Sequence, residues 1–245
     1  MNPVSTGSKT VILIPTYNER ENIRMIVPEI FAAHPDVHIL VIDDNSPDGT
    51  GEEVHLLAGQ YSHLELLARP SKQGLGAAYK HGIQHTLASG DIGRIVMMDA
   101  DGSHPVEYLA PMLEASQAYD LVVGSRYIKG GGIENWEPWR YAMSRYGNFY
   151  ARTLTGLPVR DLTAGFLCFR GDLLSRMDLD KVGASGYAFL MDLKYHAVAD
   201  MKARVKEVPI IFKSRREGES KISHHIIREG LKTPLRLFLR RVGFK

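Results

Sequence analysis

Two pairs of carboxylates follow apolar runs in this 245-residue chain, and their types and spacing suit metal chemistry. One pair is Asp43 and Asp44, and the second pair is Asp99 and Asp101. Neighbouring carboxylates repel each other, and a hard divalent cation with oxygen ligands offsets that repulsion. In proteins Mg²⁺ or Mn²⁺ commonly bridges such groups to substrate phosphates. The pattern indicates a Mg²⁺ or Mn²⁺ site, while the use of aspartate in turns and helix caps is the alternative.

A third apolar run, residues 11–14, leads into Pro15, Tyr17 and Glu19. If the three runs are parallel strands, their polar ends share the sheet edge at which α/β proteins bind ligands. Tyr17 could stack on a base, and Glu19 or Asp44 could accept hydrogen bonds from a base or a ribose. The second acidic pair would hold the metal and, through it, a diphosphate. These residues together predict a nucleotide-sugar site.

Two neighbouring features are less specific. Residues 72–76 read Lys-Gln-Gly-Leu-Gly, which is not the GxGxxG fingerprint of dinucleotide sites. We interpret this stretch as the entry to a helix near the site. His104 stands directly before Pro105, and it is either a metal ligand or part of a helix entry.

The elements that must position these residues alternate along the first half of the chain. Short runs that are apolar at every position are typical of parallel strands covered on both faces, and helical patterns lie between them. The sequence therefore predicts an α/β doubly wound fold with a mostly parallel sheet. The predicted strands are 11–14, 39–42, 64–68, 95–98 and 121–123, and the predicted helices are 19–33, 76–88 and 105–118.

The second half is less regular, and it ends in a basic segment. We predict helices over 139–155 and 188–201 and strands over 164–169 and 205–212. Residues 213–245 carry ten Lys and Arg against three Glu. Apolar residues recur at helical spacing over 222–242, with cations between them, as in an interfacial membrane helix. Alternatively, this segment is a helix that docks on the protein core, or a partner subunit covers its apolar side.

We expect a flexible N-terminus at 1–9, a catalytic domain at 10–221 and a basic amphipathic segment at 222–245. The net charge of +2 implies no nucleic-acid partner. The single cysteine, Cys168, rules out a disulfide framework. No apolar run approaches the roughly 20 residues of a membrane span, and the first ten residues lack the apolar core of a secretory signal. These features predict a cytoplasmic protein.

Eight ordered motifs resemble the inverting glycosyltransferase family 2, and within it the dolichol-phosphate (polyprenol-phosphate) mannose synthases. They read PTYNERENI, VIDDNSPDGTG, RPSKQGLGAAYKHG, MMDADGSHPVEYL, DLVVGSRYIKGGG, DLTAGFLCFR, SGYAFLMDL and FKSRREGESKI. The resemblance implies a GT-A fold, GDP-mannose as donor, dolichyl or polyprenyl phosphate as acceptor, and Mg²⁺ or Mn²⁺. It also implies work at the cytoplasmic membrane surface, with a small membrane-anchoring subunit as a possible partner. The same fold using UDP-glucose or another nucleotide sugar is the alternative.

The resemblance also assigns roles to individual residues. Three sets of residues would bind the donor. The nucleoside would be bordered by Pro15, Tyr17, Glu19, Ile42 and Asp44. The acidic set is Asp99, Ala100, Asp101 and Ser103, and the basic set is Arg126, Arg215 and Lys221. The metal would be held by Asp99, Asp101 and Ser103, where some relatives have Gln in place of the serine. The acceptor phosphate would be held by Arg126, Arg140 and Ser144. Asp99, Asp101 and Arg126 would be catalytic, and Asp192, where Glu is frequent, would orient an arginine or the substrate.

A phosphate acceptor changes the chemistry that such a site needs. Polyprenyl phosphate is already anionic and is itself the nucleophile, so no general base is required. The difficulty is repulsion between two anionic reactants, which arginines and a cation offset. We expect a single in-line displacement with inversion at the anomeric carbon. A nucleotidyltransferase is disfavoured because no basic glycine-rich loop follows the first strand, and a non-catalytic lipid-phosphate-binding subunit because the acidic and basic sets are both intact.

Overall fold

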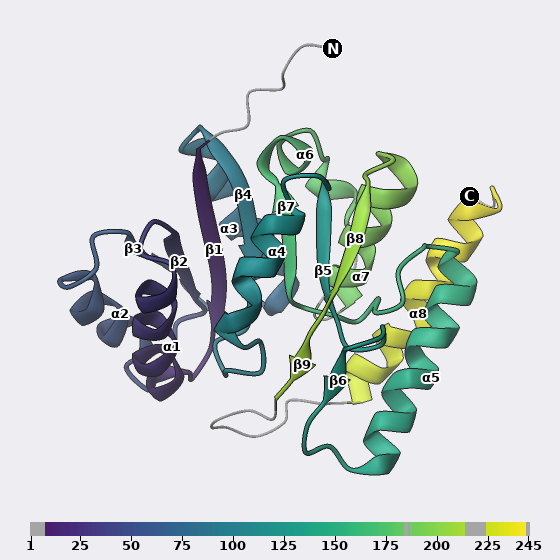
Figure 1. The fold of residues 1–245 in the computed structure, drawn as a ribbon, viewed down its shortest axis with the longest axis horizontal. Helices are drawn as coiled ribbons and strands as arrows, with labels where there is room; N and C mark the ends of the chain where they lie inside the picture. Colours follow the sequence, from purple (N-terminus) through teal and green to yellow (C-terminus); the bar gives the residue numbers. More distant parts are fainter. Residues whose placement is uncertain (1–7, 184–185, 187, 214–223, 244–245) are drawn as a thin grey trace.

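A seven-stranded sheet forms the centre of the molecule (Figure 1). The structure, a computed structural model, describes residues 8–183, 186, 188–213 and 224–243, with only the backbone of 224–227. The strand order is β3-β2-β1-β4-β7-β5-β8. The strands are β1 (Lys9–Thr16), β2 (His38–Asp43), β3 (Leu64–Ala68), β4 (Ile92–Met97), β5 (Leu121–Ser125), β7 (Leu167–Arg170) and β8 (Val205–Pro209).

Helices cover both faces of this sheet, which explains the apolar runs. In β1, Ile12 and Ile14 pack into one core and Leu13 into the other. The first core lies under α1 (Arg20–Ala33), α2 (Thr50–Ala58) and α4 (Leu109–Ala115). The second lies under α3 (Leu75–Ala88), α5 (Pro138–Thr155), α6 (Gly171–Ser175) and α7 (Ala188–Tyr195). The predicted doubly wound α/β class is confirmed.

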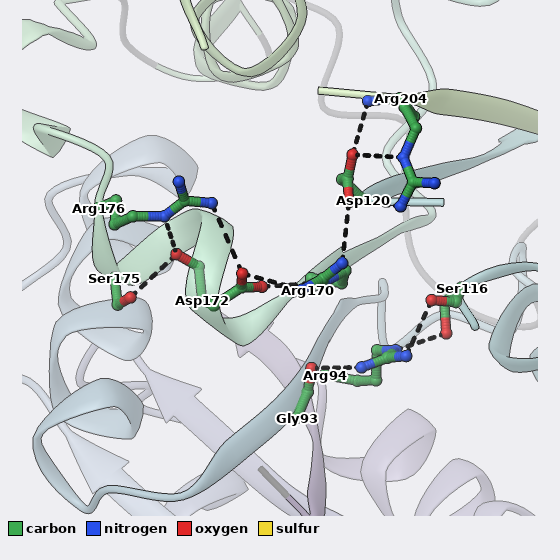
Figure 2. Close-up of polar contacts among 9 residues, drawn as sticks. All are labelled: Gly93, Arg94, Ser116, Asp120, Arg170, Asp172, Ser175, Arg176 and Arg204. Carbon is green, nitrogen blue, oxygen red and sulfur yellow. Dashed lines mark hydrogen bonds and ion pairs between the residues drawn. The ribbon is translucent and has the colours of Figure 1, made fainter. Parts of the chain in front are cut away.

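Strand β7 departs from the parallel pattern. It pairs antiparallel with both β4 and β5, and it begins at Leu167 rather than at residue 164 as predicted. Arg170 fixes its end, because the guanidinium reaches Asp120 at 3.1 Å and Asp172 at 2.9 Å. The backbone N–H of Arg204 also donates to Asp120 (2.8 Å), so β5, β7 and β8 are tied together at this edge (Figure 2).

Several predicted boundaries were wrong. Helix α2 was not predicted at all; it begins directly after Gly49, whose φ is +85°. The predicted helix 105–118 is a 3-10 turn at Val106–Tyr108 followed by α4. The predicted helix 188–201 is α7 continued as a wider π-helix over His196–Asp200. The predicted strand 205–212 is interrupted at residue 210, where the chain leaves β8 and forms β9 (Ile211–Phe212), which pairs with β6 (Gly132–Ile133).

The last helix, α8 (His224–Arg241), lies beside α5 at one end of the molecule (Figure 1). Its Leu237 is buried, so one side of the helix docks on the protein. Arg236 donates to the buried carboxylate of Asp192 on α7 at 2.7 Å. Arg240 reaches Asp200 at 2.8 Å. Among the described residues no helix is both long enough and apolar enough to cross a bilayer.

Candidate active site

The ends of β1 and β2 meet at the predicted edge of the sheet. The hydroxyl of Thr16 donates to Asp43 (2.8 Å), and the backbone N–H of Asp44 donates to the Thr16 carbonyl (3.1 Å). Asp43 also accepts the N–H of Ser46 at 2.9 Å, so its carboxylate shapes the turn after β2. Asp43 is therefore used structurally, and Asp44 is the member of this pair that reaches the neighbouring loop.

Asp44 organises that loop from a buried position. It forms an ion pair with Arg69 and accepts the backbone N–H groups of Gln73 (3.1 Å) and Gly74 (3.2 Å). Lys72, in the same loop, places its ammonium 3.7 Å from the ring centroid of Tyr17. The glycine-rich stretch thus leads into α3, as predicted, and lies beside the residue expected to stack on a base.

The other residues that were predicted to bind the nucleotide differ in their surroundings. Pro15 is half-buried next to the end of β1, and Glu19 accepts from Asn22 at 2.6 Å. Ile42 is fully buried, and its side chain lies against Gly82 of α3, where an added Cβ would stand 2.3 Å from Ile42. The side chain of Ile42 belongs to the core, so only its backbone is placed to border a nucleotide.

The acidic loop follows β4 at the same edge. Asp101 is buried and accepts the backbone N–H of Ser103 at 3.0 Å. Asp99 is half-buried, and its backbone N–H donates to Nδ1 of His104 (3.0 Å). Burial lowers the pKa of His104 to about 4, so the ring is neutral at neutral pH. The ring braces the loop by this hydrogen bond and by stacking on Phe166, with centroids 5.0 Å apart.

The oxygen ligands that this loop offers fit a metal ion that also binds a substrate. The described residues contain no group of three or more His, Cys, Asp or Glu side chains placed to hold an ion. Asp99 and Asp101 supply two carboxylates, and the buried hydroxyl of Ser103 has no hydrogen-bond partner among the described residues. Mg²⁺ and Mn²⁺ are usually held by one or two carboxylates together with substrate phosphates and water. The set therefore fits such an ion when a diphosphate completes its shell.

Arg126 follows β5 and is held by a buried carboxylate that the sequence analysis did not assign. Its Nε and Nη2 donate to the two oxygens of Asp161, both at 2.7 Å, and Nη2 also reaches the hydroxyl of Thr163 (2.7 Å). The Arg126 guanidinium lowers the pKa of Asp161 against the effect of burial. Nη1 of Arg126 has no hydrogen bond within the described part of the chain and remains the donor suited to a phosphate oxygen.

The two other predicted phosphate-binding residues lie on the first turns of α5. The Arg140 guanidinium lies 4.3 Å from the ring centroid of Trp136, and Arg126 lies 6.0 Å from the same ring. The hydroxyl of Tyr127 donates to that of Ser144 (2.7 Å). The structure therefore brings Arg126, Arg140 and Ser144 together around one aromatic cluster.

Phe212 of β9 connects this cluster to the acidic loop. Its ring lies 5.3 Å from the Arg126 guanidinium and 5.7 Å from the ring of His104. The next residue, Lys213, donates its backbone N–H to the carbonyl of Ser103 at 3.3 Å. The predicted donor ligands Arg215 and Lys221 lie outside the described residues.

Sequence reasoning missed the residues that hold the site in place. Asp161 and Thr163 belong to the motif DLTAGF, but no role was assigned to them. Lys194 was also missed; it is fully buried, donates to the carbonyl of Ala164 at 2.7 Å, and has a pKa lowered to about 7 by burial. A charged residue just before the apolar stretch 164–169 was the available signal for Asp161.

Replacing Asp161 with Asn is expected to lower the free energy of unfolding by about 3–5 kcal/mol. The variant keeps the side-chain shape but leaves the buried Arg126 cation without its counter-charge. Thermal and urea unfolding of both proteins measure the difference. Because the folded-state pKa of Asp161 is lowered, the stabilisation is present above about pH 3.9, the ordinary value, and is lost as the pH falls below it.

The exposed pair of Lys80 and Asp180 supplies the matched control. Asp180→Asn removes the same charge in water-exposed surroundings and should cost about 1 kcal/mol or less. Equal and small losses in both variants would show that the Asp161–Arg126 pair does not support the site.

A mostly parallel sheet with acidic residues at the carboxyl ends of its strands is consistent with the GT-A class of glycosyltransferases. The model of glycosyl transferase family 2 matches residues 11–182, and the chain belongs to this family. Among solved structures, glucosyl-3-phosphoglycerate synthase from Mycobacterium tuberculosis, in complex with Mn²⁺, UDP and phosphoglyceric acid, shares the fold. Its TM-score is 0.65 at 15% identity, covering 98% of this chain and 80% of that one. The chain is therefore a glycosyltransferase.

Two curated relatives are much more similar in sequence. A polyprenol monophosphomannose synthase from Mycolicibacterium smegmatis is 45% identical over 231 residues, covering 93% of this chain and 86% of the relative. An undecaprenyl-phosphate mannosyltransferase from Micrococcus luteus is 41% identical over 224 residues, covering 91% of each. The predicted resemblance to family 2 is confirmed.

Proposed function

We propose that this enzyme transfers mannose from GDP-mannose to a polyprenyl phosphate, giving polyprenyl β-mannosyl phosphate and GDP. The near full-length match to two mannosyltransferases that act on polyprenyl acceptors carries the proposal. The geometry agrees with it, because an acidic loop suited to a metal–diphosphate lies beside arginines suited to a second phosphate. To form a sugar phosphate, the acceptor phosphate must come close to the diphosphate of the donor.

The residues of the chain have separate tasks in this reaction. Arg140 and Ser144, with Nη1 of Arg126, hold the acceptor phosphate and bring one of its oxygens to the anomeric carbon. Arginine suits this task because its planar donors match phosphate oxygens and stay charged at all working pH values. Asp161 keeps Arg126 in place as a positioning residue. No proton has to leave the nucleophile, so no side chain acts as general base.

Asp99, Asp101 and Ser103 would hold Mg²⁺ or Mn²⁺, which would supply positive charge to stabilise the departing diphosphate. Ala100 lies between the two carboxylates, and its backbone borders the donor. Pro15, Tyr17, Glu19 and Asp44 border the guanosine, and Arg215 and Lys221 grip the diphosphate. Inversion follows because the acceptor phosphate attacks from the side opposite the leaving group.

The acceptor's long apolar tail resides in a bilayer, so we place the enzyme at the cytoplasmic surface of a membrane. The basic residues of 213–245 support this placement, since each Lys or Arg near an anionic leaflet contributes about 1 kcal/mol. A small membrane-anchoring subunit is compatible with such a peripheral enzyme.

Transfer of labelled mannose to a short, water-soluble prenyl phosphate tests this function. We expect an anionic product that carries both the labelled mannose and the prenyl chain, forms with Mn²⁺ or Mg²⁺, disappears with EDTA and returns when excess metal is added. A parallel reaction with UDP-glucose tests the alternative donor. Faster transfer from UDP-glucose, or transfer only to neutral hydroxyl acceptors, would contradict the proposal.

A further inference from the structure

One lysine side chain is enclosed near the residues that would hold the acceptor phosphate. Lys194 lies on α7 and is fully buried. Its ammonium donates to the carbonyl of Ala164 at 2.7 Å, and it forms no salt bridge with a carboxylate in the described part of the chain. Lysine is almost never fully buried unless it is paired, because burial of a charge costs free energy. Packing alone therefore does not explain this residue.

The carbonyl of Ala164 belongs to a turn that holds Arg126. The first residue of this turn is Asp161, and both of its carboxylate oxygens accept hydrogen bonds from the Arg126 guanidinium at 2.7 Å. The backbone N–H of Ala164 donates to the carbonyl of Asp161 at 3.4 Å, which closes the turn. The ammonium of Lys194 is therefore attached to the same turn that fixes the phosphate-binding arginine.

The same turn is connected to α5. The backbone N–H of Thr163 donates to Oδ1 of Asn148 at 3.1 Å, and the Asn148 amide donates to the hydroxyl of Thr163 at 2.9 Å. The Asn148 amide also donates to the carbonyl of Ser144 at 3.0 Å. The turn at 161–164 therefore connects Lys194 with both elements that carry the predicted acceptor-phosphate residues.

Lys194 changes the net charge of this buried group. Arg126 and Asp161 form an ion pair, and the opposite charges of a close pair largely cancel at a distance. With the ammonium of Lys194 added, two buried cations accompany one buried carboxylate, so the group is net positive. Glu207 on β8 also attracts the ammonium, but it is only half-buried, and nearby water weakens its effect. Lys194 thus restores the positive charge that Asp161 cancels on Arg126.

We propose that Lys194 is a positioning residue whose buried positive charge strengthens the binding of the acceptor phosphate at Arg126. The inference rests on the proposed function, in which Nη1 of Arg126 holds that phosphate. Because Lys194 is enclosed, it contacts neither substrate and acts through the turn at 161–164 and through its electric field. Such a field is weakened less in a buried site than in water. The role explains why the chain contains a cation that folding alone would disfavour.

This role makes binding of the acceptor depend on pH. Burial is the largest influence on Lys194 and lowers its pKa to about 7; Asp161 and Glu207 oppose this change, and Arg126 adds to it. Although burial opposes both shifts, mutual attraction raises the pKa of Arg126 and lowers the pKa of Asp161, so both groups stay charged. Lys194 alone loses its charge as the pH rises through about 7, and its contribution to phosphate affinity should then be lost.

Calorimetric binding of a short, soluble prenyl phosphate to the enzyme with GDP and Mn²⁺ tests this charge. Lys194→Met replaces the ammonium with an unbranched apolar side chain, and Lys194→Gln removes the charge but keeps a hydrogen-bond donor. At about pH 6 both variants should bind the prenyl phosphate about three- to tenfold more weakly than the wild type. At about pH 8.5, where Lys194 is neutral, the difference should disappear. The affinity for GDP should change less than about twofold at either pH. Comparing the proteins at one pH cancels the ionisation of the phosphate ester itself.

Urea unfolding distinguishes this role from a structural one. Replacement of a buried charge by an apolar side chain is often neutral or stabilising. Lys194→Met should therefore be at least as stable as the wild type at about pH 6. Because the folded-state pKa of Lys194 is lowered, the wild type gains stability as the pH rises above about 7, so an advantage of the variant should shrink there. A less stable Lys194→Met variant would assign Lys194 a structural role instead.

Lys202→Met is the matched control. The ammonium of Lys202 also donates to an alanine carbonyl, that of Ala199, at 2.7 Å, but this lysine is exposed. Its replacement removes the same kind of hydrogen bond and the same charge from a position in water. Prenyl phosphate binding should therefore match that of the wild type at both pH values.

The outcomes separate failure of this inference from failure of the proposed function. Wild-type affinity in both Lys194 variants, or an equal loss of affinity for GDP, would overturn the inference while the proposed function stands. Weakening by Lys194→Met alone, or a loss that persists at high pH, would assign the effect to the hydrogen bond with Ala164 and overturn the role of charge. A wild type that binds the prenyl phosphate but transfers no mannose to it rejects the proposed function, and the comparison of variants remains valid.

Discussion

Replacing Asp101 with Ala is expected to reduce mannosyl transfer by about a thousandfold or more at every Mn²⁺ concentration. Asp101 is buried, and its carboxylate holds the turn of the acidic loop through the N–H of Ser103. Under the proposed function, its loss would remove a metal ligand and thereby the charge that would oppose the developing negative diphosphate. Initial rates over a range of Mn²⁺ concentrations, with calorimetric binding of GDP in Mn²⁺, measure both consequences.

Asp36→Ala provides the control for Asp101→Ala. Asp36 is an exposed aspartate in the turn between α1 and β2, so its removal should leave the rate and GDP affinity unchanged. Thermal unfolding confirms that both variants are folded. An Asp101→Ala enzyme that keeps its kcat at saturating Mn²⁺ would remove this residue from the metal site.

Replacing Arg140 with Ala should raise the KM for the acceptor, or lower kcat, by about 10- to 100-fold. A hydrogen bond to a charged group is worth about 1.5–3 kcal/mol, which gives an effect of this size. The guanidinium rests on Trp136 beside Arg126, so only the contact to the second phosphate should be lost. The affinity for GDP-mannose should change little. Steady-state kinetics with each substrate varied in turn separates the two effects.

Arg145→Ala is the control on the same helix. Arg145 is exposed and donates to the hydroxyl of Tyr141 at 3.4 Å; because the Tyr141 ring packs edge-on against Tyr127, Arg145 reaches the aromatic cluster only through this intervening ring. With a soluble acceptor it should behave as the wild type. Equal weakening of donor and acceptor by Arg140→Ala would assign Arg140 to the donor diphosphate or to general stability.

The polar edge of the sheet could be predicted from sequence, but the direction of β7 and the presence of α2 could not. Residues 11–14 and 39–42 are apolar at every position, so two-sided burial and the location of Asp44 followed from periodicity. Residues 167–169 are equally apolar, yet β7 runs antiparallel, because burial on both faces does not encode strand direction. Helix α2 escaped notice because it is short and follows a dense turn.

Within the site, local features could likewise be predicted from sequence, whereas contacts between distant residues could not. The acidic loop is local in sequence, so its position after a strand was enough to identify it. The contact of Arg126 with Asp161 spans 35 residues, and the contact of Tyr17 with Lys72 crosses from one strand end to another loop. Such pairings depend on tertiary packing, which one sequence does not reveal.

The ion pair between α8 and α7 means that the basic C-terminus is not a detachable anchor. Asp192 is buried, and Arg236 bonds to it from the final helix, while Arg240 bonds to Asp200. Ending the chain after Lys221 would take the two guanidinium groups away from α7 and from the π-helix that follows it, and would uncover the side of α5 that α8 now covers. A shortened enzyme would therefore lose activity through instability even with a soluble acceptor, so full-length proteins with single surface changes are the sound way to separate lipid attachment from catalysis.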